Sequence, residues 1–237
     1  MTSHDHNASP LSAFGTDDGS VPLAVAAALA DYASGHIDAY AVVAVLRASR
    51  VLVPLVPVLD ANKVTVHAGL ENDDKHLATP IVAGTDGRRG LPTFTHVAAL
   101  AAWRTDARPV PTAVTDLATS ALQEDVDAII VDPFGPVTFT IGRPAIEAIA
   151  QGRDWVPAGL DPRVRAAIAE ALVGVAGLQS IELGASTDDA DVQVVLVLDP
   201  QAEPRATLES AAERLANSPV VQGSIERGLE LGYRPAD

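Results

Sequence analysis

The hydrophobic pattern of the first 60 residues predicts a polar tail, two helices and a strand. Residues 1–20 mix polar, acidic and glycine residues without periodicity, which is typical of a disordered tail. Two short apolar helices follow, and Gly35 between them indicates a helical hairpin. The β-branched run at 50–58 predicts a strand, whose Pro54 and Pro57 favour an edge position or an irregular strand because proline donates no ladder hydrogen bond.

A glycine-containing turn separates the next two predicted strands, 78–85 and 90–94. Its Asp-Gly pair suits the positive φ of a tight hairpin turn. We then expect a helix capped by Thr95, and a proline-containing loop at 108–111.

The pattern continues with one more helix, a hairpin and a closing helix. Thr115 can cap the first of these helices. The apolar run at 126–132 and the alternating run at 137–141 predict the two strands of a hairpin, with 132–136 as its turn. Pro144 is expected to open the closing helix.

A break in the pattern at 155–159 predicts a domain boundary. Beyond it, a helix, two strands, a helix and a last strand form a small α+β unit. We therefore predict an α/β (α+β) fold in three parts. They are a disordered tail at 1–20, an α/β domain of helical hairpin and mixed sheet at 21–157, and a smaller α+β domain at 160–237.

Composition and charge narrow the classes of function. Hydrophobic residues make up 48% of the chain and aromatic residues only 4%, so the core must consist of aliphatic side chains. The net charge of −15 repels phosphate backbones and argues against nucleic-acid binding through a basic face. The chain has no cysteine, no apolar run of membrane-spanning length and no signal-peptide pattern at its start, so we expect a cytoplasmic protein without membrane contact.

Motifs that carry chemistry are missing from the sequence. We find no phosphate-binding or dinucleotide-binding glycine loop, no nucleophile elbow and no histidine pair with the spacing of a folded metal site. We therefore predict no catalytic residue, no cofactor and no metal, and favour a protein that is not an enzyme.

Five residues are candidates for binding a ligand or a partner. Arg88 and Arg89 lie beside glycines at the predicted hairpin tip and could hold a carboxylate or phosphate; the simpler interpretation is a solvated turn whose arginines offset nearby acids. Arg108 is a candidate third cation. Trp103 suits core packing or a pocket wall, and Trp155 at the predicted boundary suits an exposed or interdomain contact.

Several collinear segments resemble one known family. They are Ala48–Pro54, Asp86–Thr95, Leu100–Trp103, Ala107–Pro111, Val131–Pro133, Gly135–Pro136 and Phe139. In this order they resemble the N-terminal domain of the SseB family over roughly residues 25–156, and 160–237 is similar to that family's less sharply defined C-terminal domain. The resemblance implies an α/β N-terminal domain, and it implies no catalytic residue, cofactor or substrate.

Two hypotheses of function follow. The first is a non-enzymatic interaction or regulatory protein that binds an unidentified protein through the Arg88–Arg89 hairpin and the segment 103–111, with self-association left open. The second is a sensor or enzyme for a small anionic metabolite, such as an amino acid, held by the same hairpin. A concave pocket bounded by the arginines favours the second, and a convex tip favours the first.

Overall fold

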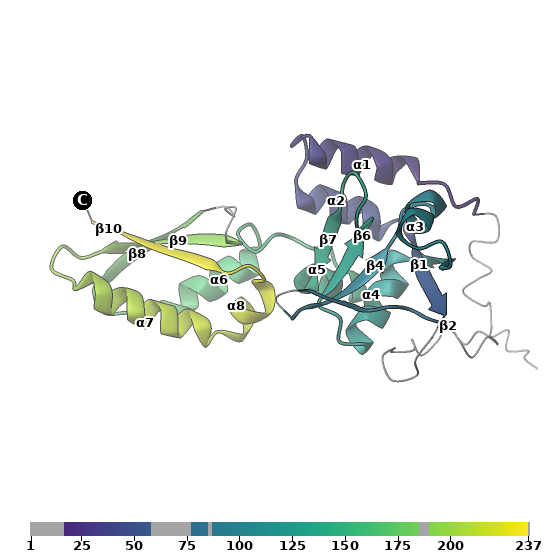
Figure 1. Cartoon of the computed structure of the whole chain (residues 1–237). Coiled ribbons are helices and arrows are strands. Elements are labelled where there is room, and N and C mark those ends of the chain that lie inside the picture. The colour runs from purple at the N-terminus through teal and green to yellow at the C-terminus, as the bar shows by residue number, and fades with distance from the viewer. Residues whose placement is uncertain (1–16, 58–76, 85–86, 185–189, 237) are drawn as a thin grey trace, which may run out of the picture. The chain divides into compact units, whose positions relative to one another are not determined.

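The computed structural model describes residues 17–57, 77–84, 87–184 and 190–236 (Figure 1). The chain divides into two compact units, one ending at Trp155 and one beginning at Val156. Both units combine helices with β-sheets, so the predicted α+β class is confirmed. The predicted tail lies outside the described residues up to position 16, and so do residues 85 and 86 of the predicted hairpin turn.

Unit 1 begins with the predicted helical hairpin of α1 (Leu23–Ala33) and α2 (Ala39–Arg47). Gly35 between the helices has a φ of +72°, which glycine adopts without steric cost. Asp38 caps α2, because its carboxylate accepts a hydrogen bond from the Ala41 N–H at 3.0 Å.

Two sheets follow the helical hairpin in unit 1. The first has the order β2-β1-β5 and is antiparallel; its strands are β1 (Arg50–Pro57), β2 (Leu77–Ala78) and β5 (Arg108–Ala113). The second has the order β3-β4-β6-β7; its strands are β3 (Val82–Ala83), β4 (Arg89–Thr93), β6 (Ala128–Val131) and β7 (Phe139–Gly142). Within this second sheet only the β4–β6 pair is parallel, and the predicted hairpins β3–β4 and β6–β7 are both present. The single strand predicted at 78–85 is wrong, because its residues are divided between β2 of the first sheet and β3 of the second.

Strand β1 is central in its sheet although it contains Pro54 and ends at Pro57, so of the two predicted alternatives, an edge position or an irregular strand, the edge position is wrong. Leu52 exchanges both backbone hydrogen bonds with Phe94, and Val56 pairs with Ala78 of β2. Alternate residues of a strand direct their N–H groups to the same side. Pro54 therefore falls in the gap between these two partners, where its missing N–H leaves no acceptor unpaired.

The predicted loop at 108–111 is instead the edge strand β5. Pro111 lies opposite Leu52, and Pro109 lies opposite Pro54. Since the Leu52 N–H is bonded to Phe94, these pairs are the non-hydrogen-bonded ones of the ladder. The ring nitrogens of β5 thus face away from β1, which is the arrangement that an edge strand tolerates.

Three helices complete unit 1, and two of their predicted caps are wrong. The helices are α3 (Val97–Trp103), α4 (Val114–Gln123) and α5 (Arg143–Ala150). The residue before α3 is His96, and the Thr95 hydroxyl bonds to Asp132 instead of capping the helix. Thr115 lies inside the first turn of α4, after Ala113.

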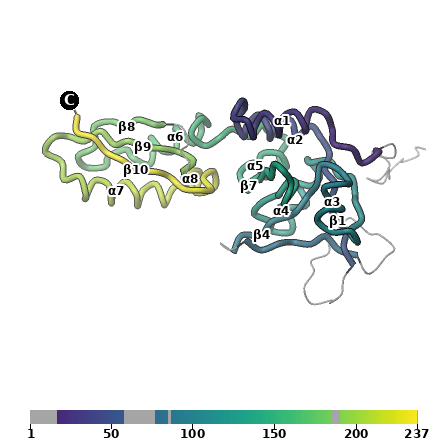
Figure 2. Tube along the Cα trace, turned by 45° about the horizontal axis from the view of Figure 1, so that its top comes forward, coloured from purple at the N-terminus to yellow at the C-terminus, as the bar shows by residue number. Residues whose placement is uncertain are grey.

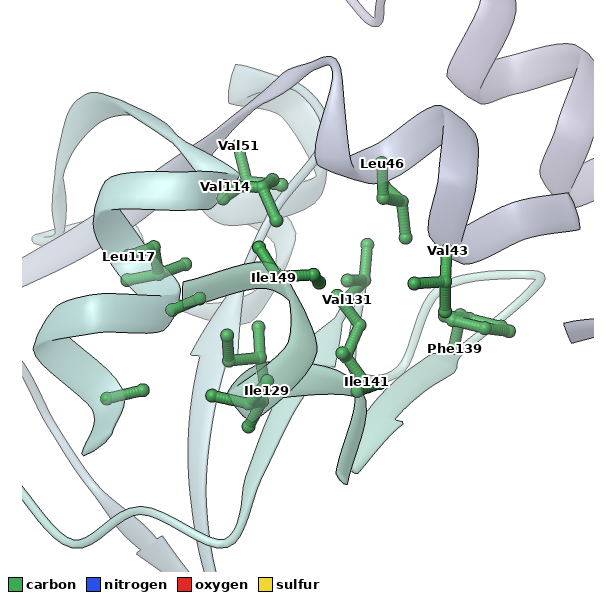
Figure 3. Close-up of a cluster of buried hydrophobic side chains, with 14 of the residues drawn as sticks. Val43, Leu46, Val51, Val114, Leu117, Ile129, Val131, Phe139, Ile141 and Ile149 are labelled. Atoms are coloured by element: carbon green, nitrogen blue, oxygen red, sulfur yellow. The ribbon is translucent and has the colours of Figure 1, made fainter. Parts of the chain in front are cut away.

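Aliphatic side chains form the main core of unit 1 (Figure 3). Ile129 of β6 and Ile141 of β7 lie opposite each other and are fully buried. Val43 of α2, Leu117 of α4 and Ile149 of α5 pack on the same cluster. These three helices therefore cover one face of the β3-β4-β6-β7 sheet. This packing fixes the β6–β7 hairpin against α2.

Unit 2 is a single three-stranded sheet with helices (Figure 2). Its elements are α6 (Pro162–Ala171), β8 (Leu178–Gly184), β9 (Val192–Leu198), α7 (Pro204–Ala216), α8 (Pro219–Ser224) and β10 (Leu229–Pro235). Strand β9 pairs antiparallel with β8 and parallel with β10. Alternate residues of β9, such as Val194 and Leu196, pack on Ile168 and Ala211 of the helices.

Candidate functional site

The predicted cationic pair lies where the β3–β4 turn meets β4, and neighbouring acids lie close to Arg89, the first residue of that strand. The Arg89 N–H donates to the Asp127 carboxylate at 2.7 Å, and the Arg89 Nη1 donates to the Asp125 carbonyl at 3.1 Å. The Asp125 carboxylate also lies 4.0 Å from Nη1. Arg89 is therefore fastened to the loop before β6, and its charge is partly offset there.

The other predicted residues lie in different parts of unit 1. Arg108 begins β5, while Arg88 directly precedes β4 in the second sheet. Trp103 ends α3 and stacks at a tilt on Phe94, with ring centroids 5.4 Å apart. Phe94 follows Arg89 by five positions, about 16 Å along an extended chain, so Arg89 and Trp103 lie toward opposite ends of β4. Trp155 is partly buried against the main core.

A second turn, between β6 and β7, shows the most unusual geometry of the unit. The Gly135 N–H donates to the Asp132 carbonyl at 2.9 Å and closes a four-residue turn. Pro133 occupies its second position, and Phe134 occupies the third with a φ of +67°. This is the type II pattern, whose third position normally requires glycine.

Phe134 is also the most exposed large hydrophobic side chain among the described residues, at 91% of its surface. A non-glycine residue in the left-handed region costs about 1–2 kcal/mol. The sequence Asp-Pro-Phe-Gly matches a type I turn, with glycine in the fourth position, so nothing in it pointed to positive φ at Phe134. Sequence reasoning missed this residue for that reason.

Asp132 fixes the start of the β6–β7 turn and is only 6% exposed. Its carboxylate accepts the Thr95 N–H at 2.8 Å and the Thr95 hydroxyl at 2.6 Å. Its own N–H donates to the Thr93 carbonyl at 2.9 Å, and its carbonyl accepts the Thr138 hydroxyl at 3.0 Å. These bonds hold Asp132 at a φ of +49°, so the strained turn is imposed by its surroundings.

Arg50 extends this support to the segment before α1. It is 7% exposed and donates from Nη1 to the Thr95 carbonyl at 2.6 Å. Its Nη2 donates to Asp17 at 2.9 Å and to the Ser20 carbonyl at 2.5 Å, and its Nε also bonds to the Asp17 carboxylate. The Arg50 guanidinium lowers the pKa of Asp17 below its usual value. We call the chain Asp17–Arg50–Thr95–Asp132 the turn brace.

Thr95 lies between an acid and a histidine, two kinds of group that can activate a hydroxyl nucleophile. Its hydroxyl donates to Asp132 and lies 2.9 Å from the His96 Nδ1. A catalytic hydroxyl needs a base that takes its proton and an open approach for the substrate. Thr95 is 2% exposed and donates to a carboxylate that also holds the Thr95 backbone, so the group acts as a support for the turn.

Unit 2 contains a groove of about 700 Å³ between α6, α7 and α8. Glu170, Glu213, Arg214 and Val220 are among the residues that line it. The Arg214 Nη1 donates to the Val173 carbonyl at 2.7 Å. None of the five residues predicted from the sequence lines this groove.

The described residues contain neither a cluster of metal ligands nor a helix that could span a membrane. Within 17–57, 77–84, 87–184 and 190–236, no three or more His, Asp or Glu side chains group together as metal ligands would. In that same part of the chain, no helix has the length and apolarity needed to cross a membrane.

Comparison with known proteins gives one match. Neither the curated proteins nor the solved structures contain a sequence or fold significantly similar to this chain. The family model described as SseB protein N-terminal domain matches residues 25–148, which include α2, α4 and the whole β6–β7 hairpin. The predicted likeness of 160–237 to an SseB C-terminal domain lies outside this match and stays a prediction. Because the match covers more than half of the sequence, the chain belongs to the SseB family.

Proposed function

We propose that this SseB-family chain is a non-enzymatic interaction protein, and that its protein partner binds over the β6–β7 turn with Phe134 as the anchor. One observation carries the proposal: a phenylalanine that is 91% exposed occupies a backbone position with a φ of +67°. Glycine at that position would remove the strain, and a polar residue would remove the exposed apolar surface. Neither folding nor solubility therefore accounts for Phe134.

A binding role accounts for both costs. Aromatic side chains are enriched in the buried centre of protein interfaces, where a few residues supply most of the affinity. A side chain on a rigid turn loses little conformational entropy when it binds. The turn brace supplies that rigidity through Asp132, which is held at both its carboxylate and its backbone.

The contacts of Arg89 support a protein partner more than a small anionic metabolite. An anion site needs cationic groups that face the ligand with little competing acid nearby. Arg89 instead donates to the Asp125 carbonyl beside the Asp125 carboxylate, and its own N–H donates to Asp127. An anionic ligand would have to compete with both of these carboxylates.

The test compares three full-length proteins: the wild type, Phe134→Gly and Leu23→Ala. Leu23 is the matched control, since it is 88% exposed but sits at the first residue of the regular helix α1. Each protein is immobilised and used to capture partners from an extract of its native cells, and the retained protein is then titrated against all three. We expect Phe134→Gly to weaken binding about 30-fold, the effect of losing an interface hot spot, while Leu23→Ala binds as the wild type does.

Stability measurements on the same proteins separate binding from folding. Phe134→Gly should leave the free energy of unfolding unchanged or higher, because glycine relieves the backbone strain. Equal partner binding by the wild type and Phe134→Gly would contradict the proposal. A loss of binding together with a loss of stability would show that Phe134 serves the fold instead.

A further inference from the structure

The two chain segments that frame the Phe134 turn contain acids and neither lysine nor arginine. Residues 17–46, which hold α1 and most of α2, include four aspartates and neither lysine nor arginine. Residues 128–142, the whole β6–β7 hairpin, include one aspartate and again no lysine or arginine. The hairpin aspartate, Asp132, is buried in the turn brace, so the exposed acids belong to the helical segment.

These segments lie side by side at the base of the turn. Tyr32 in the last turn of α1 packs edge-on against Phe139, with ring centroids 5.1 Å apart. Phe139 pairs with Val131 at the base of the β6–β7 turn, and Figure 3 shows Val43 of α2 beside it. The end of α1 and the body of α2 thus adjoin the turn that displays Phe134.

Two exposed carboxylates lie at this junction. Asp31 precedes Tyr32, and 56% of its side-chain surface is exposed. Asp38 caps the start of α2 and is also exposed. His36 lies between them in the chain, with its Nδ1 3.9 Å from the Asp31 carboxylate. These two carboxylates lie in the helical hairpin that adjoins the β6–β7 turn through the Tyr32–Phe139 contact, and we call them the Asp31–Asp38 rim.

We infer that the partner presents a basic protein segment, with an apolar pocket for Phe134 and lysine or arginine side chains that face the Asp31–Asp38 rim. The inference rests on the proposed function and names the class of its partner. Charge complementarity carries it, since a rim of one sign attracts the opposite sign and repels its own. A second copy of the chain would bring another net charge of −15, and a nucleic acid would bring phosphates, so both are repelled.

The experiment uses the full chain with the photoreactive amino acid p-benzoylphenylalanine at position 134, produced in the native cells. Irradiation links position 134 to whatever lies within reach, and mass spectrometry identifies the linked segment. The same amino acid at position 23 is the control. It lies nine residues before Tyr32, about 14 Å away along α1. We expect a link specific to position 134, to a segment with an excess of lysine and arginine.

A second variant tests the charges directly. Asp31→Asn combined with Asp38→Asn should lower the yield of that link about fivefold at low ionic strength, and the difference should vanish in high salt because exposed charge pairs are weak and screened. An acidic or neutral linked segment, a link to a second copy, or no effect of the double variant would overturn the basic partner while leaving Phe134 as the anchor. No link specific to position 134 over position 23 would overturn the proposed function as well.

Discussion

The two hairpin turns of unit 1 solve the same backbone problem with different residues. In the β3–β4 turn, glycine takes the left-handed conformation, as Gly87 has a φ of +83°. The conspicuous side chain there, Arg89, bonds back to Asp125. In the β6–β7 turn, Asp132 and Phe134 take positive φ, and Phe134 makes its side chain almost wholly accessible.

Folding alone explains the residues of the β3–β4 turn, but it does not explain Phe134 in the β6–β7 turn. A glycine at positive φ and a cation next to acids are what local stability selects. Phe134 departs from local rules in two ways, because it has a positive φ without being glycine and because its large apolar side chain is exposed. Such departures cluster at functional sites, where other contacts offset their cost. The backbone conformation of Phe134 therefore indicates a functional residue more strongly than the positive charge of Arg89 does.

The largest expected effect comes from the turn brace. Arg50→Met should lower the free energy of unfolding of unit 1 by about 3 kcal/mol, because removing one member of a buried ion pair leaves the other without a partner. Asp17 and the carbonyls of Ser20 and Thr95 lose their donor in this variant. Urea unfolding followed by tryptophan fluorescence measures the change in unit 1 alone, since Trp103 and Trp155 are the two tryptophans of the chain.

An exposed ion pair is the control for Arg50. Arg104 donates to Asp106 at 2.9 and 2.6 Å on the surface of unit 1, and Arg104→Met should barely move the unfolding midpoint.

The pKa of Asp17 is lowered in the fold, so the stabilisation that Asp17 contributes is complete above the unfolded pKa of about 4 and is lost as pH falls through the folded value. This acid-sensitive part of the stability should disappear in Arg50→Met; if it persists, Arg50 is not its source.

The next effect tests Asp132 itself. Asp132→Ala should destabilise unit 1 by about 2 kcal/mol, because the buried N–H and hydroxyl of Thr95 lose their acceptor. Asp132→Asn should cost less, since its amide oxygen still accepts one bond and asparagine tolerates positive φ. The same fluorescence measurement compares the two variants. Equal losses would mean that the carboxylate does not support the turn through Thr95.

A mirrored pair of substitutions compares the two turns directly. Phe134→Gly should stabilise unit 1 by about 0.5–1 kcal/mol, the relief of left-handed strain minus the entropy that glycine adds to the unfolded chain. Gly87→Ala should destabilise it by a similar amount, since a Cβ at Gly87 meets no atom within 4 Å and only the backbone is strained. Opposite shifts of the urea midpoint confirm the contrast, and shifts of the same sign contradict it.

The elements that depend on neighbours in sequence were predictable. The helical hairpin around Gly35 and the strands β6 and β7 follow from local periodicity and turn chemistry, and the structure contains them. The family was predictable too, because collinear segments carried the resemblance, and the family model covers 25–148.

The features that depend on distant contacts were not predictable. Strand β5 looked like a loop because Pro109 and Pro111 suit a loop, and only the register with β1 shows that their nitrogens face outward. The brace under Phe134 joins residues 17, 50, 95 and 132, so no local window of sequence contains it. Arg89 was found by its charge, and the acids that hold it lie 36 and 38 residues further along the chain.

The smallest expected effect belongs to Arg89, one of the two hairpin arginines that the sequence singled out. Arg89→Gln should change the stability of unit 1 by at most about 0.5 kcal/mol, because its contact with the Asp125 carboxylate is long and largely exposed to water. The backbone bond to Asp127 is kept, since it uses the Arg89 N–H. In the capture experiment, Arg89→Gln should retain the partner as the wild type does. If it loses the partner as completely as Phe134→Gly, the interface includes the β3–β4 turn, and a contrast in which only one of the two turns binds is wrong.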